Sequence, residues 1–379
     1  MTRTCLLVAC CLLAGLARAQ IPETIGTESL PARTPHWVWV DDLSFGNIID
    51  GRAYLVDADA GRVLGMLSTG ALFLNLELPR SYERIYSAET YYARGTRGPR
   101  TDVISIYDPK TLEPIDEIVI PAKRQAGLPM PFYTGLTDDQ RFMLVYNFTP
   151  AQSVTVIDIA ARKVMGEIAT PGCALIYPSG ARRFSMLCAD GALLSVEIGD
   201  DGGEAKRVRS EAFFDPKLDP ITEKGARLGS HWMFVSFDGV VHDVDFSGPA
   251  PQYATPWPIL TDSERKAGWR TGGAQHVALH AQSGRLYLLM HKGAVETRKE
   301  PGTDVWVYDV ATHERAQRLR LAAPAVSITV TPDATPLLLA TLGDGKLEVY
   351  EAASAKHLRT VEGLGQTPLL IQTLPTGGS

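Results

Sequence analysis

The sequence lacks the motifs that carry most enzymatic chemistry. It contains no G-x-S-x-G nucleophile elbow, no G-x-x-x-x-G-K-[ST] phosphate loop, no G-x-G-x-x-G turn and no H-E-x-x-H metal pair. His276 and His280 have the spacing of a helical metal pair, but their segment reads as strand, turn, strand. On a strand, side chains four residues apart stand about 13 Å from each other, too far for one ion. We therefore expect no catalytic, cofactor-binding or metal-ligating residue in this chain.

An excess of positive charge and long internal apolar runs are also missing. The chain has 37 Lys and Arg against 43 Asp and Glu, a net charge of −6. This balance argues against nucleic acid, whose binding surfaces are basic. Beyond the N-terminus no stretch reaches the roughly 18 uninterrupted apolar residues of a membrane span. We expect neither a nucleic-acid partner nor a membrane anchor.

The N-terminus has the pattern of a secretory signal. Arg3 is followed by an apolar run from Cys5 to Leu16 and by Ala-Arg-Ala at 17–19, a small-x-small cleavage site. A lipoprotein signal ending at Cys10 is the alternative, although it would leave almost no apolar stretch before the cysteine. We expect residues 1–19 to be cleaved, which exports the protein and leaves a mature net charge of −8.

Thiols are scarce, because cleavage would leave only Cys173 and Cys188 of the five cysteines. If the stretch between them is a hairpin whose turn is centred between Gly180 and Ala181, paired residues have numbers that sum to 361, as these two do. Opposed residues on antiparallel strands lie about 4.5 to 5.5 Å apart at Cα, within reach of a disulfide. A metal site would need further ligands and a redox pair usually has the C-x-x-C spacing, so we predict a disulfide in an exported protein.

What the chain does have is a repeat. A β-type alternating run, an acidic residue, a short turn and a second β-type run recur seven times. The acidic positions are Asp57, Asp108, Asp158, Glu197, Asp245, Asp309 and Glu351. Their spacings of 51, 50, 39, 48, 64 and 42 residues suit four-stranded propeller blades. Each acidic side chain is expected to cap its turn by accepting backbone N–H bonds.

Seven copies predict an all-β, seven-bladed β-propeller over residues 36–379, preceded by a loose arm at 20–35. A two-domain β protein and an open-ended solenoid are the alternatives, but radial closure deals with edge strands without caps. His36–Val40 is the candidate strand for closing the ring against the last blade. Within the longest spacing, Thr261 and Glu264 form the capping box of a short inserted helix.

Several motifs in matching order resemble the heavy subunit of the quinoprotein amine dehydrogenases, the methylamine and aromatic amine dehydrogenase family. They are DAGRVLGM (59–66), ARGTRGPRTDV (93–103), SVTVIDIA (153–160), CADGAL (188–193), GWRTGGAQHVALH (268–280), GRLYLLMH (284–291) and LRTVEGLG (358–365). The resemblance spans essentially the whole mature chain. The stretches GWRTGG and DPKTLEPIDEI favour the methylamine type, whereas PAKRQAGL and the spacing from Phe45 to Asp57 favour the aromatic type.

The resemblance implies a periplasmic assembly of two heavy and two light subunits. The light subunit of that family carries tryptophan tryptophylquinone and oxidises primary amines to aldehydes, and electrons pass to a blue copper protein of the amicyanin or azurin kind. The heavy subunit is a non-catalytic scaffold that docks the light subunit, and Phe45 matches a phenylalanine at the substrate entrance. The competing hypothesis is a stand-alone exported propeller, either a binding protein or a hydrolase such as a lactonase that uses its central channel.

Overall fold

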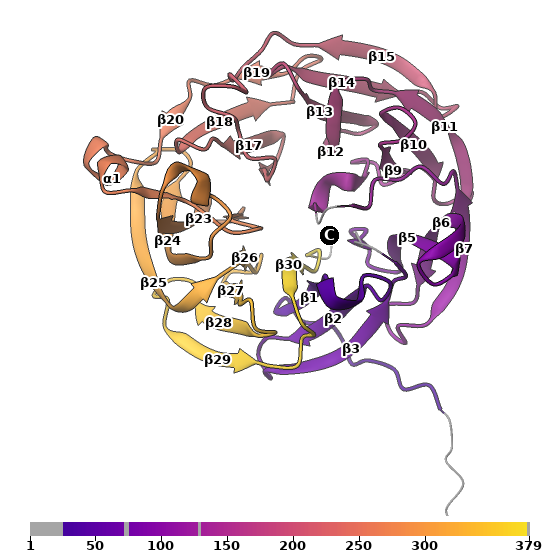
Figure 1. Ribbon diagram of the computed structural model, residues 1–379, viewed down its shortest axis with the longest axis horizontal. Coiled ribbons are helices and arrows are strands. Elements are labelled where there is room, and N and C mark those ends of the chain that lie inside the picture. The colour runs from indigo at the N-terminus through magenta and orange to yellow at the C-terminus, as the bar shows by residue number, and fades with distance from the viewer. Residues whose placement is uncertain (1–25, 72–75, 128–129, 377–379) are drawn as a thin grey trace, which may run out of the picture.

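The computed structural model describes residues 26–71, 76–127 and 130–376. Within these ranges the regular secondary structure is almost entirely β-strand, folded into seven antiparallel sheets arranged as a ring (Figure 1). This is the seven-bladed β-propeller that the repeat predicts. No helix in the described part of the chain is long and apolar enough to cross a membrane. The predicted signal at 1–19 lies outside the described residues.

The first four blades are built, from the axis outward, as follows. Blade 1 has β30 (Pro368–Thr373), β1 (Trp37–Asp42), β2 (Arg52–Asp57) and β3 (Arg62–Ser68). Blade 2 has β4 (Leu76–Glu77), β5 (Ile85–Arg94), β6 (Arg97–Tyr107) and β7 (Pro114–Ile120). Blade 3 has β8 (Thr134–Leu136), β9 (Phe142–Asn147), β10 (Ser153–Asp158) and β11 (Lys163–Ala169). Blade 4 has β12 (Cys173–Gly180), β13 (Arg183–Cys188), β14 (Leu193–Ile198) and β15 (Glu204–Arg209).

The last three blades follow the same plan with small additions. Blade 5 has β16 (Ala226–Leu228), β17 (His231–Val235), β18 (Val240–Asp245) and β19 (Gln252–Tyr253), and β20 (Trp257–Pro258) also pairs with β18. Blade 6 has β21 (Trp269–Thr271) and β22 (Val277–His280), which both pair with β23 (Arg285–Lys292), then β24 (Gly302–Asp309) and β25 (Arg315–Ala325). Blade 7 has β26 (Ser327–Val330), β27 (Leu337–Thr341), β28 (Leu347–Glu351) and β29 (His357–Val361). The described residues also form the 3-10 helices η1 (Phe45–Asn47), η2 (Pro131–Tyr133) and η3 (Val295–Thr297).

The ring closes inside blade 1, where the two ends of the propeller meet. β1 pairs on one side with β2 and on the other with the C-terminal strand β30, with Val40 opposite Ile371. The N-terminal strand therefore does close the ring, as predicted, but it pairs with a C-terminal strand that the repeat did not reveal. The last complete repeat, blade 7, lies beside this sheet.

Burial changes from the axis to the rim. The middle strands β1, β9 and β10 are buried at every position, because each blade packs both faces against its neighbours. The rim strand β15 is almost entirely exposed and carries four charged side chains. Such charged, short outer strands discourage pairing with a second sheet edge.

The acidic repeat residues all lie in or directly after the third strand of a blade, and most cap the turn as predicted. The carboxylates that accept backbone N–H bonds from the turn are those of Asp57, Asp108, Asp158, Asp245 and Asp309. The prediction is wrong at Glu197, which lies within β14, and Asp201 Oδ1 accepts the turn bond from Gly203 instead. Because β14 continues one residue beyond Glu197, this side chain lies in the strand before the turn begins. The prediction is also wrong at Glu351, whose carboxylate accepts from the Ser354 hydroxyl and not from a backbone N–H.

Two segments outside the blades also have ordered contacts. The insertion contains the expected helix, α1 (Asp262–Lys266), with Thr261 and Glu264 forming the capping box. The end of the N-terminal arm is less loose than predicted, because the Leu30 N–H donates to the Lys110 carbonyl at 2.8 Å.

Candidate functional site

The direction of the strands divides the loops between two faces of the ring. One face carries the turns from the second to the third strand of each blade and the crossings from one blade to the next. We call it the Phe45 face, because η1 follows β1 there. The other face carries the turns capped by the acidic repeat residues.

Phe45 begins η1, directly after Ser44, which has a left-handed backbone at φ 42°. The residue is 61% exposed, and its neighbours Ile48 and Ile49 are 42% and 40% exposed. Three large apolar side chains within five residues therefore stand at the surface of one short connection. A loop that only packed its own side chains would bury them.

A buried carboxylate holds this connection in place. Asp42, the last residue of β1, accepts hydrogen bonds from three backbone N–H groups, those of Ser44 (3.0 Å), Gln366 (3.1 Å) and Thr367 (2.7 Å). The clamp requires glycine at 365, because a Cβ there would lie 1.9 Å from Asp42 Oδ2 and the residue has φ +79°. The η1 connection is thus fixed to the loop before β30.

Sequence reasoning identified Phe45 only through a resemblance, and it missed this support. The available signals were the two adjacent acids that end an apolar strand and the glycine-containing stretch before the C-terminal run. Neither signal shows by itself that the two segments meet, because they lie more than 300 residues apart.

Exposed apolar side chains gather on the Phe45 face. The large apolar residues exposed among the described residues fall into two groups. Those on the Phe45 face are Phe45, Ile48, Ile49, Tyr91, Phe148, Leu218 and Val295, and those on or beside the outermost strands are Val63, Met66, Ile115, Val119, Tyr253 and Leu358. None of them lies on the acid-capped turns of the opposite face. One face of the ring is therefore suited to contact another apolar surface.

The predicted disulfide is confirmed. Cys173 and Cys188 face each other across β12 and β13 and are bonded, with 3.9 Å between their Cα atoms. Each backbone N–H bonds outside the pair, to Thr170 and Ala192, so this is the closer, non-hydrogen-bonded type of pair.

The turn register behind that prediction is wrong. The turn is centred one residue later, since Gly180 pairs with Arg183. Two irregularities in β12 restore the sum of 361 at the cysteines, and Leu175 at one of them has a φ of 66°. The sequence did not predict the extra residues that these two bulges place in β12.

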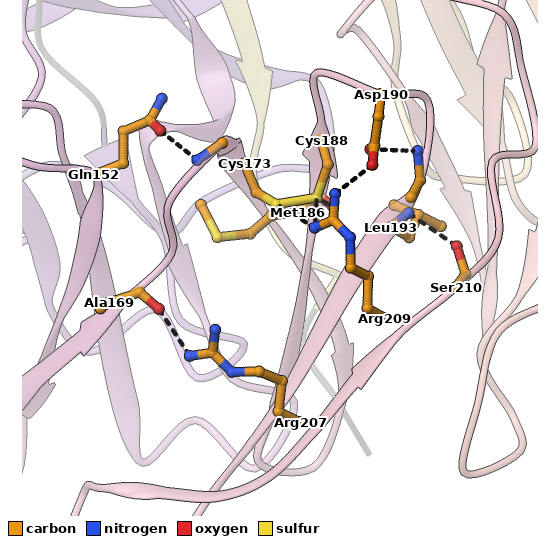
Figure 2. Close-up of a disulfide and its surroundings, with 12 residues drawn as sticks. Gln152, Ala169, Cys173, Met186, Cys188, Asp190, Leu193, Arg207, Arg209 and Ser210 are labelled. Atoms are coloured by element: carbon orange, nitrogen blue, oxygen red, sulfur yellow. Dashed lines mark hydrogen bonds and ion pairs between the residues drawn. A yellow bond between two sulfur atoms is a disulfide. The ribbon is translucent and has the colours of Figure 1, made fainter.

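Arg209 covers the disulfide from the outermost strand of the blade (Figure 2). One guanidinium nitrogen lies 3.3 Å from Cys173 Sγ and 3.1 Å from Cys188 Sγ, and the other pairs with Asp190 at 2.6 Å. Both sulfurs are buried at the edge of the Phe45 face, where the disulfide ties the first two strands of blade 4 together. The position of the disulfide indicates a structural role, the stabilisation of blade 4.

The two histidines with metal-pair spacing point to different partners. His276 Nε2 lies 3.2 Å from Thr222 Oγ1, whereas His280 contacts Ser283 Oγ and the Asp333 carbonyl. Both are buried. The described residues contain no group of three or more His, Cys, Asp or Glu that could hold a metal ion.

The six tryptophans are packing residues. All are buried, and they are Trp37, Trp39, Trp232, Trp257, Trp269 and Trp306. The closest pair of indoles, Trp269 and Trp306, has ring centroids 5.1 Å apart at a tilt of 46°, with the Arg318 guanidinium over both. This is ordinary aromatic and cation–π packing.

Solved structures share the fold at low sequence identity. A putative 6-phosphogluconolactonase from Bacteroides fragilis superposes with a TM-score of 0.60 at 11% identity, over 90% of this chain and 99% of that one. The dihydro-heme d1 dehydrogenase NirN superposes with a TM-score of 0.57 at 15% identity, over 93% of this chain and 78% of that one. These likenesses concern the propeller fold alone.

Sequence comparison identifies the family. The family model for the methylamine dehydrogenase heavy chain matches residues 35–375. The methylamine dehydrogenase heavy chain of Methylorubrum extorquens is 31% identical over 95% of this chain and 88% of its own length, and that of Paracoccus versutus is 32% identical over 90% and 80%. The chain therefore belongs to the methylamine dehydrogenase heavy chain family.

Proposed function

We propose that this chain is the heavy scaffold subunit of a periplasmic amine dehydrogenase with two heavy and two light subunits. In that assembly the Phe45 face docks the light subunit. The observation that carries the proposal is the gathering of exposed apolar side chains on this one face, in a chain that belongs to a heavy-chain family. Large apolar side chains exposed on one face of a protein are typical of protein–protein contacts, and three of these lie on one short connection, at Phe45, Ile48 and Ile49.

Tryptophan tryptophylquinone on the light subunit supplies the amine-oxidising chemistry. This chain contributes shape and the exclusion of water. Phe45 lies on a connection clamped by Asp42, so its ring can form a wall of the substrate entrance at a fixed position. The buried tryptophans of this chain stay in the blade cores and take no part in the cofactor.

The cellular setting follows from the same proposal. A cleaved signal at 1–19 places the chain in the periplasm, where the Cys173–Cys188 disulfide is stable. A blue copper protein receives the electrons. Methylamine-type substrates are favoured, and aromatic amines are the alternative.

A matched pair of variants tests the docking face. The double variant Ile48→Asp/Ile49→Asp places two charges beside Phe45, at side chains that are 42% and 40% exposed. The control Val63→Asp/Met66→Asp makes the same changes on β3 of the same blade, at side chains 36% and 42% exposed. Each tagged chain is expressed in its native host and isolated, and the co-purified small subunit is quantified.

We expect the first variant to co-purify with at most about one tenth of the light subunit that wild type retains, because two carboxylates would be desolvated in an apolar contact. The control should retain as much as wild type. Equal retention by both variants would refute docking at the Phe45 face. Isolation of the wild-type chain alone in an active form would instead support a stand-alone propeller.

A further inference from the structure

A cavity of about 110 Å³ lies on the propeller axis, near the Phe45 face. Its walls come from the innermost parts of three blades and from η2. The lining residues used below are Asp41, Phe132, Lys224, Val277, Leu370 and Gln372. A single buried water needs roughly 10–15 Å³ by the same kind of measure, so the space admits a small organic ion.

The carboxyl group of Asp41 is buried, and one of its two oxygens has no partner among the described residues. The residue is 2% exposed, and Oδ1 has no hydrogen bond within the described parts of the chain. Burial raises the pKa of this carboxyl well above its usual range. Polar groups in protein interiors are normally satisfied, so an unpartnered acid facing a cavity calls for a ligand.

Gln372 contributes a second unpartnered acceptor to the same cavity. Its Nε2 donates to the Leu76 carbonyl at 3.0 Å, which sets the amide so that Oε1 is left as an acceptor. Oε1 is buried and has no partner among the described residues. In the β1–β30 register Asp41 stands opposite Leu370, so Gln372 is its diagonal neighbour on the same side of the sheet.

An ionised Asp41 would have no counter-charge of its own among the described residues that line the cavity. Lys224 lines the cavity, but its ammonium group is paired with the Glu223 carboxylate. His276 adjoins them, and burial together with Lys224 lowers its pKa to about 3, so the ring is neutral. Because burial favours the uncharged form of Asp41, its carboxylate forms only when a cation binds; ionised Asp41 and Glu223 against one ammonium group would then leave one negative charge for that cation to balance.

We propose that this axial cavity binds a small primary ammonium ion. Its N–H groups donate to the Asp41 carboxylate and to Gln372 Oε1, and its alkyl end rests against Phe132, Val277 and Leu370. Two acceptors in an apolar pocket suit such a cation, whereas a divalent metal takes six or more oxygen ligands. The site belongs to this chain alone and does not depend on the docking of a light subunit.

Calorimetry on the purified full chain, without a light subunit, tests the site. Methylammonium chloride is titrated at an ionic strength held constant with tetramethylammonium chloride, which has the same charge and no N–H donor. We expect saturable binding at one site per chain. Asp41→Asn should weaken it at least tenfold, because a charge-assisted hydrogen bond is lost, and Gln372→Met should weaken it as well.

Asp344→Asn is the matched control, since it makes the same change at an exposed carboxylate of the β27–β28 turn. It should bind methylammonium as wild type does. Asp41→Asn has nearly the same shape and introduces no buried charge, so its unfolding temperature should not fall, which separates loss of binding from loss of fold. The absence of saturable binding in wild type, unchanged affinity in Asp41→Asn, or equal competition by tetramethylammonium and potassium would each overturn the proposal.

Discussion

Removing the Cys173–Cys188 disulfide should lower the stability of the propeller by about 3 kcal/mol. The cysteines are 15 residues apart, and closing a loop of that length restricts the unfolded chain by roughly this free energy. Alanine is the better replacement than serine, because both positions are buried and a hydroxyl would lack a partner.

The structure keeps other contributions small. Arg209 would lose its contacts with the two sulfurs but keep its ion pair with Asp190, which is half exposed and contributes little. For a propeller of roughly 340 residues, the entropy of unfolding is about 0.7 kcal/mol per kelvin. The loss of about 3 kcal/mol therefore corresponds to a fall of about 4 °C in unfolding temperature.

The assay is thermal unfolding of wild type and of Cys173→Ala/Cys188→Ala, each with and without a reductant. Wild type should unfold about 4 °C lower once reduced, and the double variant should unfold at the reduced temperature under both conditions. A double variant within 1 °C of oxidised wild type would refute the reasoning. Mass spectrometry of the exported protein without reductant should show the two cysteine peptides joined.

Three further predictions concern buried charge and the substrate entrance. Burial raises the pKa of Glu77 to about 7, although a hydrogen bond from Thr134 opposes the shift. The free energy of unfolding of wild type should therefore fall, by up to about 3 kcal/mol, as pH rises from about 4.5 to about 7. In Glu77→Gln, denaturant unfolding at a series of pH values should show little of this fall. Burial by itself would lower the pKa of His36, but the carboxylates of Asp59 and Asp333 outweigh it and raise the pKa. The stabilisation by protonated His36 is therefore present at low pH and lost as pH rises through its folded pKa, so His36→Gln should lose less stability than wild type between pH about 6 and about 8. Phe45→Ala should change the ranking of kcat/KM among amines in the assembled enzyme, and an unchanged ranking would mean that Phe45 only packs.

The repeat predicted the fold because each blade carries the same local signal. Alternating apolar residues followed by an acidic residue mark the third and fourth strands of every blade, and Asp57 and Asp309 cap equivalent turns. β30 lacks that signal because it is the innermost strand of its blade. Among the described residues it pairs in the sheet with β1, at the other end of the chain. Pairing between distant segments is decided by the closed ring and not by the strand's own residues.

The site was less predictable than the fold. The cysteine partners could be identified from an assumed turn register, but that register was wrong by one residue at the turn. The pairing at the cysteines was correct only because two bulges in β12 offset the difference. Asp41 and Asp42 are adjacent and identical in type, yet Asp41 has a carboxyl oxygen without a partner in the described part of the chain, whereas Asp42 clamps the η1 connection. The side of the strand on which each residue lies decides its role, and the neighbours on that side come from remote parts of the chain.

The central claim is that this chain is a scaffold whose chemistry lies on a partner, and isolation of the tagged chain from its native host tests that most directly. We predict that a small, cysteine-rich chain co-purifies, that quinone staining marks only this small chain, and that amine bleaches a visible absorption band of the complex. A chain isolated without a partner, or quinone staining on the heavy chain itself, would contradict the account.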